Sequence, residues 1–424
     1  MREKINKLLR EEKYKKMISN FSYLSIINIV NKVLPLIVIP YVVRTIGVEK
    51  YGVIVFAYAI MQYFQTVTRY SFELTATKYI SVNRDDLKTI GVYFWNVIGT
   101  QFFLFLLGLL IFLPILFTYE RFYLEKEVFI FSLIFVFSNG LIPLWFFQGM
   151  EDMKYIALFN IATKVLYAVA IFIFVQTQDD YIWVPLINSI SFLLVGIFSL
   201  YFIITKYKIG FTMPSWKFIV DLLVEGKDIF LSNVSVAFYT TINTVLLGLF
   251  TNYTVVGIYG LAETLHGAYS QIIKIYSTVI YPHLARYADN TKLLYAQARK
   301  FFLFYIVILF FSALFLFFIS GIAMELLFGE GHEASILVLQ ILSLSLLFEP
   351  LGGFFTGYLA IKSEYKIIRK ITFMTMIINF IVIIPMILLY EEVGVALAFL
   401  FLSIAMVLMN LYYNKELIER KKLL

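Results

Sequence analysis

The sequence of 424 residues contains no cysteine, which excludes disulfide bonds, thiolate catalysis and metal sites built from cysteine. Its three histidines are too scattered to form a metal site. The nucleotide-binding pattern G-x-x-x-x-G-K-[ST] and the hydrolase patterns H-E-x-x-H and G-x-S-x-G do not occur. We therefore expect no enzymatic activity, no metal and no bound cofactor.

Charged residues are also scarce, at 15% of the chain against roughly 25% in a soluble domain. Hydrophobic residues make up 61%, and the mean hydropathy is +0.84. This composition is typical of an integral membrane protein that crosses the bilayer many times. The net charge of +7 is spread over short loops, so it does not indicate a nucleic-acid partner.

Twelve runs of residues are long and apolar enough to cross a bilayer core of about 30 Å as helices. The sequence thus predicts an all-α integral membrane fold with about twelve transmembrane helices. The expected spans are 21–44, 52–80, 89–117, 128–149, 155–176, 181–205, 229–250, 254–284, 301–323, 334–361, 367–390 and 393–414.

The distribution of lysine and arginine predicts the orientation of the chain. If the N-terminus is cytoplasmic, 27 of the 35 basic residues lie in cytoplasmic segments, four lie in outer loops and four lie within the spans. Positive charge accumulates on the cytoplasmic side of membrane proteins, so both termini are expected there. The first 20 residues, which begin MREKINKLLREEKYKK, are expected to form a cytoplasmic amphipathic segment.

The longest inner loop divides the twelve spans six and six, and the two halves carry a weak internal repeat. A shift of 205 aligns Arg69 with Lys274 and Gly52 with Gly257, and FFQG at 146–149 is echoed by FFTG at 354–357. Six spans in each half predict two bundles related by a pseudo-two-fold axis along the membrane normal. The expected domains are an N-lobe at 21–205, a linker at 206–228, a C-lobe at 229–414 and a tail at 415–424.

Ionisable residues within spans are costly, at about 2.5–3.5 kcal/mol each, so they indicate function by default. The cations outnumber the acids, which favours an anionic substrate such as a phosphate group in a cavity between the lobes. The candidates for substrate binding are Lys32, Arg69, Lys274, Lys164, Asn28, Asn31, Asn233 and Asn243. The candidates for ion coupling or charge balance are Glu73, Glu263, His266 and Glu349.

Several of these residues also have a purely structural interpretation. Arg69 and Glu73 are spaced i, i+4 and can pair within one helix. Lys164 can extend along its aliphatic stem toward the cytoplasmic face. His266 is more often a hydrogen-bonded interior residue than a proton switch.

The first span also has features of a gate. Pro35 and Pro40 interrupt the hydrogen bonds of a helix interior and are expected to bend it. Arg44, at the outer end of this span, is expected to anchor it at the interface, with a gating role as the alternative.

Three stretches resemble the Wzx-type oligosaccharide flippases, which form the polysaccharide transporter family of the multidrug/oligosaccharidyl-lipid/polysaccharide (MOP) exporter superfamily. The stretches are PLIVIPYVVRTIGVEKYGVIVFAYAI, FELTATKYISVNRDD at 72–86 and WFFQGMEDMKYIAL at 145–158. The resemblance implies two six-helix bundles around a central cavity. It also implies transfer of an undecaprenyl-pyrophosphate-linked glycan repeat unit, of the O-antigen or capsule type, from the inner to the outer leaflet of the bacterial inner membrane.

The related lipid II flippases carry essential cations in their first, second and eighth spans, where this chain has Lys32, Arg69 and Lys274. They have fourteen spans, and the twelve expected here argue against lipid II as the substrate. The expected partners are the lipid-linked oligosaccharide, the bilayer and other membrane proteins of glycan assembly. Transport coupled to protons or sodium ions is a further expectation.

Two other functions are compatible with parts of the sequence. A multidrug exporter of the same superfamily would move cationic compounds, which the excess of intramembrane cations disfavours. A membrane glycan polymerase or ligase would need polar catalytic loops, and the loops here are short.

Overall fold

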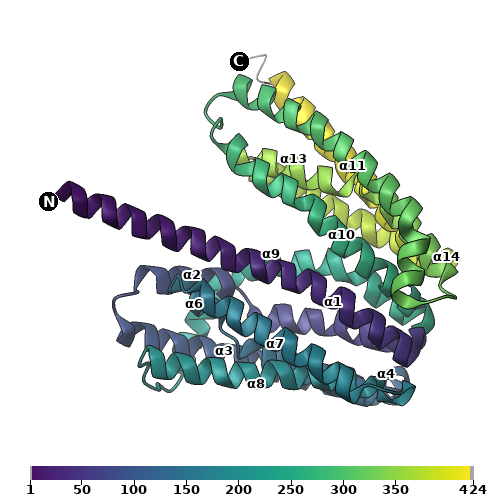
Figure 1. Ribbon diagram of the computed structural model, residues 1–424, viewed down its shortest axis with the longest axis horizontal. Coiled ribbons are helices and arrows are strands. Elements are labelled where there is room, and N and C mark those ends of the chain that lie inside the picture. Colours follow the sequence, from purple (N-terminus) through teal and green to yellow (C-terminus); the bar gives the residue numbers. More distant parts are fainter. Residues whose placement is uncertain (1, 421–424) are drawn as a thin grey trace. The chain divides into compact units, whose positions relative to one another are not determined.

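The computed structural model describes residues 2–420, and within that range it leaves out the side chains of 2–22, 24–26, 28, 29, 32, 239, 240 and 415–420. All elements of residues 2–420 are helices, and no strand occurs in that range (Figure 1). The prediction of an all-α membrane fold is confirmed. The elements are α1 (Arg2–Arg69), α2 (Phe72–Val82), α3 (Leu87–Thr118), α4 (Glu120–Leu124), α5 (Lys126–Gly140), α6 (Leu144–Gly149), α7 (Met153–Phe174), η1 (Gln178–Ile182), α8 (Trp183–Lys206), α9 (Trp216–Phe250), α10 (Tyr253–Ala285), α11 (Thr291–Phe328), α12 (Glu333–Ser345), α13 (Glu349–Ile361) and α14 (Tyr365–Arg420).

Seven helical segments of the described chain are long and apolar enough to cross a membrane, and a bent pair within α9 raises the number to eight. Two of the longest helices contain a backbone break. In α1 the break is at Gly47, whose φ is 80°, and in α14 it is at Glu391, whose φ is 48°. The chain is thus a multi-pass membrane protein, while the count of twelve spans stays a prediction.

The chain forms two compact units. Unit 1 contains the residues up to Gly47 and Phe56–Thr241, and unit 2 contains Val48–Val55 and Ile242–Leu424. The short segment of α1 in unit 2 packs closely on α10, since a Cβ atom on Gly52 would lie 1.8 Å from the carbonyl oxygen of Tyr253. Only glycine allows this approach of two helices.

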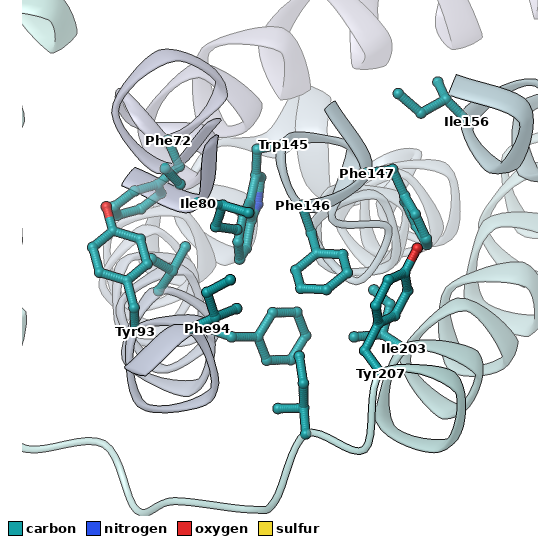
Figure 2. Close-up of a cluster of buried hydrophobic side chains, with 14 of the residues drawn as sticks. Phe72, Ile80, Tyr93, Phe94, Trp145, Phe146, Phe147, Ile156, Ile203 and Tyr207 are labelled. Atoms are coloured by element: carbon teal, nitrogen blue, oxygen red, sulfur yellow. The ribbon is translucent and has the colours of Figure 1, made fainter. Parts of the chain in front are cut away.

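The core of unit 1 includes an aromatic cluster that joins α6 to its neighbours (Figure 2). Trp145, Phe146 and Phe147 of α6 are all buried. Phe94 of α3 lies 5.5 Å from Phe146, and Tyr207 lies 5.0 Å from it on the other side, measured between ring centroids. This packing fixes α6, and with it the break that precedes α6.

Each unit contains a helix pair separated by a three-residue break. α5 ends at Gly140 and α6 begins at Leu144, while α12 ends at Ser345 and α13 begins at Glu349. The two boundaries in unit 2 lie 205 positions after the corresponding boundaries in unit 1, and the same shift aligns Arg69 with Lys274. The helix boundaries therefore agree with the repeat seen in the sequence.

Candidate substrate-binding site

Unit 1 contains a cavity of about 290 Å³ between α1, α2, α3, α5, α6, α7 and α8. Four predicted site residues line it: Asn31, Arg69, Glu73 and Lys164. The break between α5 and α6 opens part of its wall, where Asn139, Ile142 and Trp145 are found. The structure thus brings one predicted cation from the second span together with the predicted cation of the fifth.

Arg69 is held in place at the end of α1. Its Nη2 and Nε atoms donate to Oδ1 of Asn139, at 2.6 and 3.2 Å. Its Nη1 atom lies 3.2 Å from Oε1 of Glu73, and this pair is 39% and 59% exposed. An exposed pair of this kind contributes at most about 1 kcal/mol. Since Asn139 is neutral, its two hydrogen bonds orient the guanidinium but leave its charge in place.

Lys164 is the second cation of the cavity. It lies on α7, one residue after Thr163 and four after Asn160, and all three line the cavity. Among the described side chains it forms no ion pair and no hydrogen bond. Its position agrees with the cavity-facing interpretation rather than with extension to the cytoplasmic face. With Arg69 and Glu73, the described lining residues carry a net charge of +1.

The cavity wall also contains buried polar atoms without a partner. Among the described residues, these are Oδ1 of Asn31, Oε1 of Gln101, Oδ1 of Asn160 and Nε1 of Trp145. A buried polar atom that lacks a hydrogen bond costs about 1–3 kcal/mol. Three acceptors and one donor without a partner therefore belong to residues that line the cavity, which suits a ligand with hydroxyl groups.

Sequence reasoning missed several of these lining residues. Asn139 stands between Ser138 and Gly140 in a span without charged residues, and Gln101 lies five residues after Asn96, the other amide of the third span. Asn160 and Lys164 offered a clearer signal, because a spacing of four residues places two side chains on one face of a helix. Reading polar residues at helical spacing in every span would have added Asn160 to the predicted Lys164.

A second polar cluster lies in unit 2 and contains three predicted residues. Nζ of Lys274 lies 2.6 Å from Oε1 of Glu349, and Ser270 donates to Oε2 of Glu349 at 3.0 Å. Nε2 of His266 lies 3.9 Å from the same Oε2 and 3.2 Å from the hydroxyl of Ser345. Glu349 is the first residue of α13, directly after the break. Lys274 therefore contacts the broken helix pair of unit 2, as Arg69 contacts that of unit 1 through Asn139.

Three other candidates lie away from the unit 1 cavity. Asn379 donates to Oδ1 of Asn243 at 3.0 Å, and both side chains are buried, so this pair bridges α9 and α14. Asn233 donates to the carbonyl oxygen of Tyr70 at 2.9 Å. Glu263 accepts a hydrogen bond from Thr244 of α9.

The remaining candidates belong to the first span. The side chains of Asn28 and Lys32 lie outside the described residues, so their roles stay predictions. The backbone of α1 remains helical at Pro35 and Pro40, and the break that the structure shows is at Gly47. Arg44 is exposed. Among the described side chains, no group of three His, Asp or Glu residues is placed to hold a metal ion.

Long apolar helices, two compact units and cations within the spans define a multi-pass membrane protein. The chain belongs to the polysaccharide biosynthesis protein family, whose sequence model matches residues 17–288. A protein of Escherichia coli (strain K12) named as an O-antigen transporter is 28% identical over 406 residues, covering 94% of this chain and 97% of that protein. A protein of Shigella dysenteriae with the same name is 22% identical and covers 93% of this chain and 99% of its own length.

Two solved structures share the fold. The lipid II flippase MurJ, in an inward closed conformation, matches with a TM-score of 0.64 and 17% identity, over 87% of this chain and 85% of MurJ. An inward-facing multidrug resistance MATE transporter of the MOP superfamily matches with a TM-score of 0.66 and 15% identity, over 95% and 99%. The predicted resemblance to MOP-superfamily polysaccharide transporters is confirmed, and the chain is a transporter rather than an enzyme.

Proposed function

We propose that this chain is a flippase for a lipid-linked oligosaccharide. Its substrate is an undecaprenyl-pyrophosphate-linked repeat unit of the O-antigen or capsule type. It moves this unit from the cytoplasmic to the outer leaflet of the bacterial inner membrane by alternating access. The names of the two relatives and the fold shared with MurJ support this proposal. The observation that carries it is the cavity of unit 1, which combines two cations with unpaired amide oxygens.

The chemistry of the cavity suits a glycan attached to a phosphate. Sugar hydroxyl groups donate to the free oxygens of Asn31, Gln101 and Asn160, and the Trp145 N–H donates to a sugar oxygen. Arg69 and Lys164 supply positive charge for the phosphate. At about 290 Å³ the cavity is at the small end of ligand sites, so it accepts one sugar ring rather than a whole oligosaccharide.

The cluster of unit 2 has a different role in this proposal. Lys274 already has a carboxylate at 2.6 Å, so its charge is largely balanced before any substrate binds. The unit 1 cavity keeps an unpaired lysine among its described side chains and is the better anion site. Glu349, together with His266, is the candidate for coupling transport to protons or sodium ions. Flux measured against imposed pH and sodium gradients tests that assignment.

A multidrug exporter is the alternative that the MATE-like fold raises. Cationic drugs need acidic side chains in their binding site. The described lining of the cavity has the opposite sign, since Arg69 and Lys164 face the single acid Glu73. This charge balance favours the glycan substrate.

The proposal is tested by removing the cavity's polar groups in a bacterium that lacks its own copy of the chain. We expect Lys164→Met combined with Asn160→Leu to abolish surface glycan and to cause the lipid-linked oligosaccharide to accumulate on the cytoplasmic side. Lys208→Met is the matched control, because Lys208 is exposed and does not line the cavity. Normal surface glycan from a folded, membrane-inserted double variant would refute the proposal.

A further inference from the structure

Unit 2 contains a second hollow, with a volume of about 430 Å³, between α11, α13 and α14. Its walls are mainly apolar and include Phe302 and Leu303 of α11, Phe354 and Phe355 of α13, and Leu411 of α14. The ring of Phe302 lies 5.8 Å from that of Phe354 and 5.3 Å from that of Phe355. The wall is therefore a packed aromatic surface, which suits a hydrocarbon chain.

Three residues that line this groove, Arg299, Tyr358 and Asn414, carry polar groups. Oη of Tyr358 and Oδ1 of Asn414 are buried and have no hydrogen-bond partner among the described residues. The amide nitrogen of Asn414 is already used, since it donates to the carbonyl oxygen of Asn410 at 2.8 Å. Arg299 is exposed at the same groove and forms no ion pair with any described acid. Two donors and one acceptor thus belong to residues that line the groove.

These three polar residues belong to the cytoplasmic interface in the predicted orientation. Arg299 lies in the expected inner loop 286–300, Tyr358 lies three residues before the inner end of the tenth span, and Asn414 ends the twelfth. Leu303 is one helical turn from Arg299 toward the membrane interior. The groove therefore pairs a headgroup end with a hydrocarbon end, in the order in which a phospholipid of the inner leaflet presents them.

We propose that this groove binds one anionic glycerophospholipid whose headgroup carries free hydroxyl groups, as in phosphatidylglycerol. The phosphate accepts hydrogen bonds from Arg299 and Tyr358, a headgroup hydroxyl donates to Asn414, and an acyl chain lies along the phenylalanine wall. Basic pockets between helices on the cytoplasmic side are a recurrent way of binding anionic lipid headgroups. A polyprenyl phosphate without its glycan has no sugar or glycerol hydroxyl for Asn414, and a choline headgroup adds a cation beside Arg299.

The test is native mass spectrometry of the full-length, delipidated protein in detergent. The probes are dioleoyl phosphatidylglycerol, phosphatidic acid and phosphatidylcholine at equal concentrations. We expect phosphatidylglycerol to bind best. Arg299→Gln should weaken its binding about tenfold, because a charge-assisted hydrogen bond to the phosphate is lost. Lys300→Gln is the matched control, since it removes the neighbouring exposed charge, which does not line the groove.

A second set of variants separates headgroup recognition from simple charge attraction. Asn414→Leu should weaken phosphatidylglycerol binding and leave phosphatidic acid unchanged, while Tyr358→Phe should weaken both. Equal losses in the Arg299 and Lys300 variants, or equal binding of phosphatidylcholine, would overturn the proposal. Displacement of phosphatidylglycerol by an equimolar amount of undecaprenyl phosphate would also overturn it, since the groove would then belong to the transported lipid. None of these outcomes depends on flippase activity.

Discussion

The ion pair between Lys274 and Glu349 offers a quantitative test of the unit 2 cluster. Lys274 is 41% exposed and Glu349 is 22% exposed, and their charged atoms lie 2.6 Å apart. Removing one partner of a fully buried pair costs about 3–5 kcal/mol, whereas an exposed pair contributes about 1 kcal/mol or less. For this half-buried pair we expect Lys274→Met to cost about 2 kcal/mol, because the carboxylate of Glu349 loses its counter-charge.

The assay is thermal unfolding of the detergent-solubilised protein, run as a double-mutant cycle. A loss of about 2 kcal/mol corresponds to a fall in Tm of about 4 to 8 °C for a unit of roughly this size. Combining Lys274→Met with Glu349→Gln should recover most of that loss, since the double variant leaves no unpaired charge. The expected coupling free energy is about 1–2 kcal/mol.

An exposed pair serves as the reference for this cycle. Arg84 and Glu151 approach to 2.8 Å, and the carboxylate of Glu151 is 47% exposed against 22% for Glu349, so their coupling should stay below about 1 kcal/mol. If the Lys274 and Glu349 variants have additive effects, or couple no more strongly than this reference pair, then the pair does not stabilise unit 2. Lys274 would then be free to act as a substrate cation.

Two further predictions concern stability. Gly52→Ala should destabilise the protein by at least about 1–3 kcal/mol, because the added Cβ would overlap a carbonyl oxygen of α10. Gly267→Ala is the control: its added Cβ would have no atom within 4 Å, so it should stabilise α10 by up to about 1 kcal/mol. Equal effects of the two variants on Tm would contradict this packing. A hydrogen bond from the Thr89 hydroxyl is the main cause that lowers the pKa of Asp86, at the start of α3. A lowered folded-state pKa stabilises the protein above the unfolded value of about 3.9, and this stability is lost as the pH falls through the folded value. The loss of Tm below about pH 4 should therefore be smaller in Asp86→Asn, and an unchanged pH profile would refute the role of this cap.

The sequence predicted the class of fold because hydropathy is a local property. A run of about 20 apolar residues must form a helix in a bilayer, whatever its neighbours are. The same locality made the intramembrane cations visible, since a charge inside such a run is costly wherever the helix finally packs. The repeat was also visible, as the shift of 205 that aligns Arg69 with Lys274 recurs in the helix boundaries of both units.

The environment of each cation was decided only by the tertiary structure. Arg69 is oriented by Asn139, 70 positions away, and Lys274 is balanced by Glu349, 75 positions away. No periodicity within one helix predicts contacts over such separations. The sequence alone therefore determined an all-α membrane fold with charged spans. Which cation faces a cavity and which is neutralised followed from packing, because that choice depends on which helices lie side by side.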